Sequence, residues 1–384
     1  MQFDFDQNID RRGTGSIKWH YYNEDVLPMW VADMDFRSPQ PVIDALHQRL
    51  DHGIFGYAHE IPGLMESIQG WLITRYEWDV PAEHIIYVPG VVPGFNLAAQ
   101  SLARPDRGLL IQTPVYMPFL KVAANANMQY RNNQLVRQPD GRYEIDFDAF
   151  ETAVAANTGM FLLCNPHNPV GRVYTRKELE RMADICLRHG VKICSDEIHA
   201  DLIYSSNRHI PIASLSSEIA DNTITLLAPS KTFNIAGLGF SFAVISNPEL
   251  RTAFQKACRG TVGYPSVLAK EATLAAYTHG APWLDAALAY MEANRDYLYD
   301  FVKTELPGVN MAKPEGTYLT WLDCNKLDIN TSPHQFFLEK AKVGLNDGPT
   351  FGPGGEGYVR LNIGCPRSLL EEGLQRMRKA VLTL

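Results

Sequence analysis

The stretch Thr223-Ile224-Thr225-Leu226-Leu227-Ala228-Pro229-Ser230-Lys231-Thr232 joins a mostly apolar run to a single lysine. Residues 223–228 have the length and the continuous apolarity of a strand that is buried on both faces. Open α/β sheets gather their ligands at the carboxyl ends of such strands. We therefore predict that Lys231 lies at the ligand-binding edge of a parallel sheet.

Further short apolar runs alternate with helical segments and predict the other strands of this sheet. The runs are residues 84–88, 109–112, 161–164 and 191–194. Ser38-Pro39 predicts the start of a helix that Gly53 can end. The capping box Thr175-Arg176-Lys177-Glu178 predicts a second helix, which ends at Gly190. The expected fold class is therefore α/β, with a mostly parallel sheet covered by helices.

The chain of 384 residues is long enough for two domains. We expect residues 49–280 to form the large domain. We expect residues 1–48 and 281–384 to form a smaller α+β domain, with a helix over 282–306 and strands over 318–323 and 358–363. A cleft between two such parts is a usual place for a ligand.

Composition argues against several classes of partner. The net charge is -8 and no dense Lys/Arg tract occurs, which disfavours nucleic acid and anionic membrane surfaces. The first residues are acidic and do not resemble a signal peptide, and no apolar stretch approaches the roughly 20 residues that span a bilayer. The six cysteines form no Cys-x-x-Cys pair, so we expect core thiols in a cytoplasmic protein without a metal site.

A lysine at a strand end can form a Schiff base with an aldehyde cofactor or a carbonyl substrate. Its reference pKa is about 10.4, but burial and cationic neighbours lower that value and free the amine. Taken alone, a lysine at a strand end is more often a solvated loop residue, so the neighbouring strand ends decide the interpretation of Lys231.

Asp196 follows the run 191–194 and should share the sheet edge with Lys231. In pyridoxal-phosphate chemistry, a carboxylate at this place keeps the pyridine nitrogen protonated. The alternatives are a carboxylate in a turn, or a metal ligand acting with Glu197, His199 and Asp201. A metal is disfavoured because side chains in an extended segment alternate in direction.

Other strand ends offer groups that suit a flat, anionic cofactor. The turn 89–94, before a helix expected over 95–103, suits a phosphate. Asn165 or Asn168 could donate an amide hydrogen bond. Tyr116 could stack on a ring or simply pack between the domains. Arg360 could bind a carboxylate through two parallel hydrogen bonds, or could be a solvated strand residue.

Lys231, Asp196, Asn165 and Arg360 occur in the order found in fold-type I pyridoxal-phosphate enzymes, the aspartate aminotransferase superfamily. Matching segments narrow this resemblance to the MalY/PatB group of cystathionine β-lyases, or cysteine–sulfur β-lyases. They are residues 28–36, 164–169, 195–199 and 228–234. The resemblance covers nearly the whole chain.

This resemblance implies a role for each residue toward pyridoxal 5'-phosphate. Lys231 would be the Schiff-base lysine and Asp196 the partner of the pyridine nitrogen. Asn165 would bond the phenolic oxygen, and Tyr116 would stack on the ring. His199 occupies the place where the wider family often has a tyrosine, so we count it as a cofactor contact without assigning it the phenolic role.

The resemblance also implies phosphate and substrate contacts. The amides of Val91 and Val92, with Ser230, would hold the phosphate, because Gly239 stands where the wider family has an arginine. Tyr57 would reach the phosphate from the neighbouring subunit of a homodimer. The substrate contacts would be Arg360, which binds the α-carboxylate, with Asn165, Tyr57 and Trp30. Trp30 and residues 260–264 would shape the leaving-group pocket.

The implied activity is cleavage of the carbon–sulfur bond of L-cystathionine, or of a related cysteine S-conjugate, to a thiol, pyruvate and ammonia. An aminotransferase is the nearest alternative, since it shares the same early chemistry. A regulatory or binding protein that retains the cofactor pocket is the alternative from another class.

Overall fold

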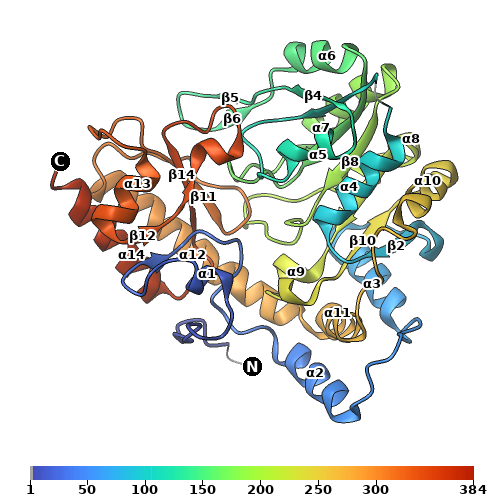
Figure 1. The fold of residues 1–384 in the computed structure, drawn as a ribbon, viewed down its shortest axis with the longest axis horizontal. Coiled ribbons are helices and arrows are strands. Elements are labelled where there is room, and N and C mark those ends of the chain that lie inside the picture. The colour runs from blue at the N-terminus through green and yellow to red at the C-terminus, as the bar shows by residue number, and fades with distance from the viewer. Residues whose placement is uncertain (1–2, 105) are drawn as a thin grey trace.

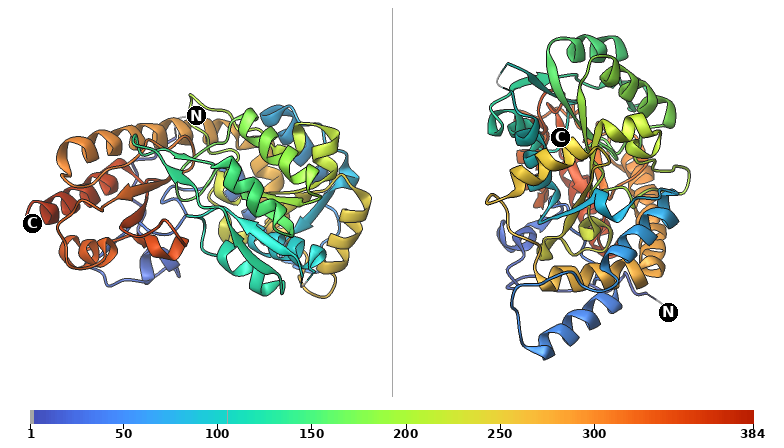
Figure 2. Two further views of the ribbon diagram at one scale, coloured as in Figure 1. Left: turned by 90° about the horizontal axis from the view of Figure 1, so that it is seen from above. Right: turned by 90° about the vertical axis from the view of Figure 1, so that its right-hand side faces the viewer.

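The structure of the protein is a computed structural model that describes residues 3–104 and 106–384 (Figure 1). Residues 1–2, on which part of the expectation about a signal peptide falls, lie outside the described residues. In Figure 2 the C-terminal elements gather at one end of the molecule, and the strands and helices from the middle of the chain gather at the other.

A seven-stranded sheet forms the middle of the chain, in the order β2-β10-β9-β8-β7-β3-β4. All its strands run in one direction except β10, which is antiparallel to both of its neighbours. The strands are β2 (Ile85–Val88), β3 (Gly108–Ile111), β4 (Gln129–Asn132), β7 (Thr158–Cys164), β8 (Lys192–Asp196), β9 (Thr223–Leu227) and β10 (Ser241–Val244). This confirms the mostly parallel sheet expected from the apolar runs.

Helices cover both faces of this sheet, as continuous apolarity predicts. In β3, Leu109 packs into the core cluster that includes Phe95 of α4 (Val91–Leu102). The next residue, Leu110, packs into the opposite cluster with Met182 of α7 (Arg176–Arg188). Successive side chains of a strand point to opposite faces, so a strand between two helical layers needs apolar residues at every position.

Two of the predicted helix ends agree with the structure, and one predicted helix start does not. The capping box of α7 forms in both directions between Thr175 and Glu178. The helix α2 (Gln40–His52) ends at Gly53, which has a left-handed φ of 74°. The prediction that a helix begins at residue 95 was wrong, because α4 begins at Val91 and its N-cap is Gly90. Proline is tolerated in the first turn of a helix, where its missing N–H has no partner to lose, so Pro93 does not delay the start.

The C-terminal part of the chain forms a second sheet and also pairs with a short strand from the N-terminal part. The strand β14 (Tyr358–Asn362) lies between β11 (Leu319–Asp323) and β13 (Asn346–Asp347). Near the N-terminus, β1 (Leu27–Pro28) pairs with β12 (Val343–Gly344). The proposed division into domains at residues 49 and 281 stays a prediction.

The other elements complete the layers. The helices are α1 (Ile17–His20), α3 (Leu64–Tyr76), α5 (Phe119–Asn125), α6 (Phe147–Ala155), α8 (Ser217–Asp221), α9 (Pro229–Thr232), α10 (Pro248–Cys258), α11 (Val267–His279), α12 (Ala281–Glu305), α13 (Pro333–Phe336) and α14 (Arg367–Val381). The remaining strands are β5 (Val136–Arg137) and β6 (Tyr143–Glu144).

The described residues contain neither a membrane-spanning helix nor a metal-binding cluster. No helix in residues 3–104 and 106–384 has both the length and the apolarity to cross a bilayer. The same residues contain no group of three or more His, Cys, Asp or Glu side chains placed to hold a metal ion. All six cysteines are free thiols.

Candidate active site

A cavity of about 190 Å³ lies where β7, β8 and β9 end. Most of the residues predicted for the site line it together: Lys231, Asp196, Tyr116, Val91, Val92, Ser230 and His199. The lining also includes Ala32, Cys164 and Asn168. Asn165, Arg360, Trp30 and Tyr57 do not line this cavity in the single chain.

Lys231 lies in the short helix α9, which follows β9 directly. Its Nζ donates a hydrogen bond to the carbonyl oxygen of Ala32 at 2.7 Å. Burial lowers the pKa of Lys231 to about 8, although the nearby carboxylate of Asp33 acts to raise it. Near neutral pH a useful share of this amine is therefore unprotonated, which is the nucleophilic form.

Asp196 is the last residue of β8 and is buried. Its Oδ1 accepts a hydrogen bond from the backbone N–H of Ile198 at 3.1 Å. Burial raises the pKa of Asp196 to about 7, and among the described residues it forms no ion pair. A buried carboxylate of this kind favours a cationic ligand, because a positive partner offsets its loss of hydration.

The N-terminus of α4 also opens on the cavity. Val91 and Val92 are the first residues of this helix, so their N–H groups have no partner within it. Free N–H groups and the positive end of the helix dipole suit a phosphate group. Ser230 adds a hydroxyl to the same lining. Gly239 also lines the cavity, at the position where an arginine would have supplied a positive charge.

Two asparagines lie beside this lining. The Oδ1 of Asn165 accepts a hydrogen bond from the N–H of Tyr174 at 3.1 Å, while its buried Nδ2 has no acceptor among the described residues. An orphaned buried donor costs stability unless a ligand accepts from it. Asn168 lines the cavity, and its Oδ1 accepts from Nη1 of Arg360 at 3.0 Å.

Arg360, in β14, is 2% exposed, so the reading of a solvated strand arginine was wrong. Its Nη2 donates to the carbonyl of Trp30 at 2.9 Å and to Oδ1 of Asn346 at 2.6 Å, and its buried Nε has no acceptor. Among the described residues no carboxylate pairs with it, and burial lowers its pKa to about 10. A buried guanidinium held only by neutral groups is ready to receive a carboxylate.

His199 is 3% exposed and lines the cavity. Burial lowers the pKa of His199 to about 3, helped by the positive charges of Lys231 and Arg360, so the ring is neutral at physiological pH. Within the described part of the chain its buried Nδ1 has no hydrogen-bond partner, and the ring of Tyr318 stands nearly perpendicular to the imidazole with centroids 6.1 Å apart. A neutral imidazole offers one donor and one acceptor to a ligand.

Two of the predicted substrate contacts, Trp30 and Tyr57, and the predicted pocket stretch 260–264 are absent from the described lining of the cavity. Trp30 is half-buried and packs against Tyr21 with ring centroids 4.8 Å apart. Tyr57 is fully exposed, and Tyr264 is 91% exposed. The expectation that residues 260–264 shape the leaving-group pocket stays a prediction.

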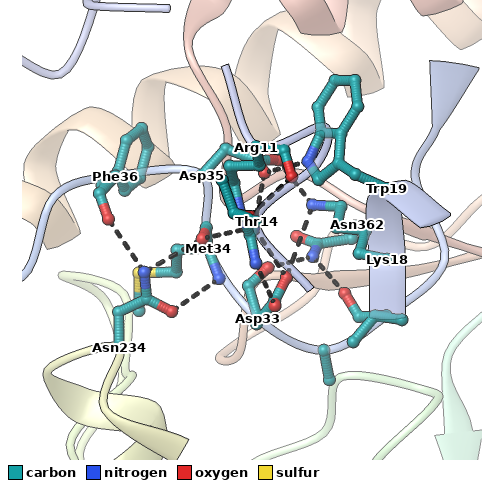
Figure 3. Close-up of polar contacts among 12 residues, drawn as sticks. Arg11, Thr14, Lys18, Trp19, Asp33, Met34, Asp35, Phe36, Asn234 and Asn362 are labelled. Atoms are coloured by element: carbon teal, nitrogen blue, oxygen red, sulfur yellow. Dashed lines mark hydrogen bonds and ion pairs between the residues drawn. The ribbon is translucent and has the colours of Figure 1, made fainter. Parts of the chain in front are cut away.

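Sequence reasoning missed the role of residues 30–36 (the strap), which bring Ala32 to the cavity. Figure 3 shows the strap held on one side by Asn234, which follows the lysine helix, and on the other by Asn362 of β14. The available signal was the polar pair Asp33 and Asp35 inside an apolar segment, since buried carboxylates need partners.

The donors around this cavity fit pyridoxal phosphate. Lys231 supplies an amine for the aldehyde, and the N-terminus of α4 suits the phosphate. Asp196 suits a protonated ring nitrogen, and the orphaned Nδ2 of Asn165 suits the phenolic oxygen. On a mostly parallel α/β sheet, this site defines a pyridoxal-phosphate-dependent enzyme.

The chain belongs to the aminotransferase class I and II family, whose family model matches residues 25–377. It is similar to cystathionine beta-lyase PatB of Bacillus subtilis, at 42% identity over 98% of this chain and 99% of the relative. Cystalysin from Treponema denticola, whose crystal structure contains a pyridoxal 5'-phosphate cofactor, matches with a TM-score of 0.95 and 35% identity over 100% of both chains. The PLP-bound C-S lyase from Staphylococcus hominis matches with a TM-score of 0.93 and 35% identity over 99% of both chains. The resemblance inferred from the four segments is therefore confirmed.

Proposed function

We propose that the protein is a pyridoxal-phosphate-dependent carbon–sulfur β-lyase that cleaves L-cystathionine or a related cysteine S-conjugate to a thiol, pyruvate and ammonia. The observation that carries this is the cavity in which Lys231, with its lowered pKa, lies beside the unpaired carboxylate of Asp196. Similarity over the full chain to a cystathionine beta-lyase supports the lyase reaction over amino transfer.

When bound, pyridoxal phosphate supplies an electron sink for the bond pair left at the substrate α-carbon. Lys231 would hold the cofactor through its amine, and its free amine would remove the substrate α-proton as a general base. Asp196 holds the ring nitrogen in its protonated form. The amide of Asn165 donates to the phenolic oxygen, and Tyr116 stacks on the ring.

The phosphate is held by neutral donors in this proposal. The donors are the N–H groups of Val91 and Val92 and the hydroxyl of Ser230, which would form hydrogen bonds to the anion. The positive end of the helix dipole adds to this attraction. His199 contributes a neutral ring to the same cavity. Tyr57 of a second subunit completes the phosphate contacts.

The departing sulfur needs a proton donor. Burial raises the pKa of Tyr116, so its hydroxyl keeps its proton at neutral pH. Lys231, after it has taken the α-proton, is the other candidate. Both residues line the cavity, and both remain candidates for this step.

Arg360 binds the substrate α-carboxylate in this proposal, with Asn165, Tyr57 and Trp30 as further substrate contacts. We expect Arg360→Gln to lower kcat/KM for L-cystathionine about a hundredfold, because charged hydrogen bonds to a carboxylate are lost. An amine analogue of the substrate that lacks the carboxylate is the control. If Arg360→Gln lowered kcat/KM for this analogue as strongly as it lowers kcat/KM for L-cystathionine, the loss would come from general damage to the site.

The protein is proposed to be a homodimer with Tyr57 reaching the partner's site. Supporting this, the irregular segment after α2 exposes large apolar side chains, with Ile54 at 65% and Phe55 at 54%. Exposed apolar clusters mark contact surfaces.

We expect the protein to sediment with twice the 43.1 kDa mass of one chain. Phe55→Asp should weaken the dimer and Tyr130→Asp, on the edge strand β4, should not; a single-chain mass for the parent would contradict the proposal.

Three broader assignments go with this function. We propose a cytoplasmic location, which free thiols in a reducing compartment support. We propose that homocysteine released from cystathionine serves methionine biosynthesis. The division into a large cofactor-binding domain, residues 49–280, and a small domain, residues 1–48 and 281–384, is proposed on the same footing.

The experiment that tests the function measures pyruvate release from L-cystathionine by the purified protein with pyridoxal phosphate and no added keto acid. Steady release over many turnovers is expected. Amino transfer that requires a keto acid, without pyruvate release, would identify an aminotransferase. No turnover with either mixture, but with retained cofactor, would favour a binding protein.

A further inference from the structure

The strap has no regular secondary structure, yet side chains distant in the sequence fix its backbone. The carbonyl oxygen of Ala32 accepts two hydrogen bonds, from Nζ of Lys231 at 2.7 Å and from the hydroxyl of Tyr318 at 2.9 Å. This carbonyl is therefore the acceptor that the unbound lysine amine uses. Its position decides where that amine rests.

Asn362 holds the carbonyls on both sides of Ala32. Its Nδ2 donates to the oxygen of Val31 and to the oxygen of Asp33, at 2.6 Å each. Its Oδ1 accepts from the N–H of Gly364 at 2.7 Å, so the amide cannot turn over without losing three bonds. Asn362 is 1% exposed, and water does not substitute easily for such a clamp.

The carboxylates of the strap are held by their own partners. Asp35 accepts from Nζ of Lys18 at 2.5 Å, from Nη1 of Arg11 at 2.6 Å and from the indole of Trp19 at 2.8 Å (Figure 3). Burial acts to raise the pKa of Asp35, but Lys18 and Arg11 outweigh it and lower this pKa. Asp33 pairs with Nη2 of Arg11 at 2.6 Å. Among the described residues these ion pairs fix the strap without an ion pair to Lys231.

The charged and titratable groups around the Lys231 amine come from several parts of the fold. Asp33 of the strap and Asp196 of β8 favour its ammonium form, whereas Arg360 of β14 disfavours it. His199 is neutral and adds no charge. Hydrogen bonding to the Ala32 carbonyl also favours the ammonium, because a carbonyl oxygen accepts most strongly from a charged donor.

We propose that Asn362 is a positioning residue for the catalytic lysine: by clamping Val31 and Asp33, it fixes the Ala32 carbonyl as the acceptor for the Lys231 amine. This rests on the proposed role of Lys231 as general base. When the lysine takes the α-proton, the substrate C–H bond breaks, an N–H bond forms, and the electron pair stays with the substrate and cofactor. The ammonium that results is held by the Ala32 carbonyl.

The chain contains a matched control for this clamp. Asn294 is buried, and its Nδ2 donates to the carbonyls of Ile363 and Cys365 at 3.1 and 2.8 Å. It makes the same kind of double clamp next to the end of β14, and it has no hydrogen bond to the strap. Asn294→Ser therefore reproduces the structural cost of losing a buried asparagine clamp.

The test uses the full-length chain freed of cofactor. Pyridoxal phosphate is added over a range of pH, and the rate of Schiff-base formation is followed by absorbance. The parent midpoint is expected near the Lys231 pKa of about 8. With Asn362→Ser the midpoint should fall by about one unit, because the ammonium loses a well-placed acceptor. Asn294→Ser should keep the parent midpoint.

A second variant and a second readout keep the test decisive. Asn362→Leu is used if the serine variant does not fold, and it should show the same shift. In the holoenzyme, the α-deuterium isotope effect on kcat should rise with either Asn362 variant and stay unchanged with Asn294→Ser. An unshifted midpoint in both Asn362 variants, or an equal shift in Asn294→Ser, overturns the proposal. A shifted midpoint without lyase activity supports it and contradicts the proposed function alone.

Discussion

Replacing Lys231 with alanine is expected to lower pyruvate release from L-cystathionine by at least about 10⁴-fold, because one residue supplies both the covalent attachment and the general base. No other lysine lines the cavity among the described residues, so no neighbouring amine can take over. Borohydride reduction should add the mass of the cofactor to the parent chain and leave the variant unchanged.

The control for this loss is Lys192→Ala. Lys192 is a half-buried lysine at the opposite end of β8 from Asp196, and its Nζ donates to Oδ1 of Asn222 at 2.7 Å. We expect this variant to keep its turnover, because it lies away from the cavity. Comparable losses in the two variants, or cofactor attached to Lys231→Ala after reduction, would contradict the assignment.

Asp196→Asn is expected to lower kcat by about 10³-fold while leaving the shape of the site intact. Burial raises the pKa of Asp196 to about 7 even though the charge of Lys231 acts to lower it, and a protonated ring nitrogen beside it would restore the charged carboxylate. The asparagine amide cannot hold that proton by charge. The measurement is kcat at saturating cystathionine and saturating cofactor.

Glu197→Gln is the matched control for this change. Glu197 is the next residue along, is equally buried, and accepts from Ser195 and from Nε2 of His209 at 2.8 Å each. It does not line the cavity, so its loss should affect stability more than kcat. A cofactor analogue methylated on the ring nitrogen carries a fixed positive charge and should recover part of the activity of Asp196→Asn. No recovery, together with an equal loss in Glu197→Gln, would refute the role of Asp196.

The apolar runs located the central sheet because two-sided burial leaves a clear pattern. Two strands escaped this reasoning for opposite reasons. The edge strand β4 reads Gln-Tyr-Arg-Asn and is largely exposed or half-exposed, so it carries no apolar run. The strand β10 (Ser241–Val244) is buried, but it is short and follows a glycine-rich turn that resembles a loop. Its reversed direction has no local signal, since direction depends on the connections.

The site was predictable wherever a side chain projects from a strand end. Lys231, Asp196 and Tyr116 follow predicted strands, and parallel strands end at one edge, so the structure brings them to one cavity. The alternation in β14 also put Arg360 and Asn362 on one face, and both hold the strap. The Ala32 carbonyl could not be predicted, because every residue has a carbonyl and only the tertiary fold shows which one a lysine reaches. Contacts that need a second subunit, such as that of Tyr57, are equally absent from a single chain.

The strap also sets an order of events during synthesis of the chain. The hydrogen bond from Asn362 to Val31 joins residues 331 positions apart, so its two partners leave the ribosome at nearly opposite ends of translation. Contacts of such long range form late and slowly in folding. The central sheet can fold on the nascent chain, but the seat of the catalytic lysine is completed only when the last strand emerges. A truncated product that lacks this strand would keep Lys231 and the cavity wall, yet would lack the geometry that holds the lysine in place.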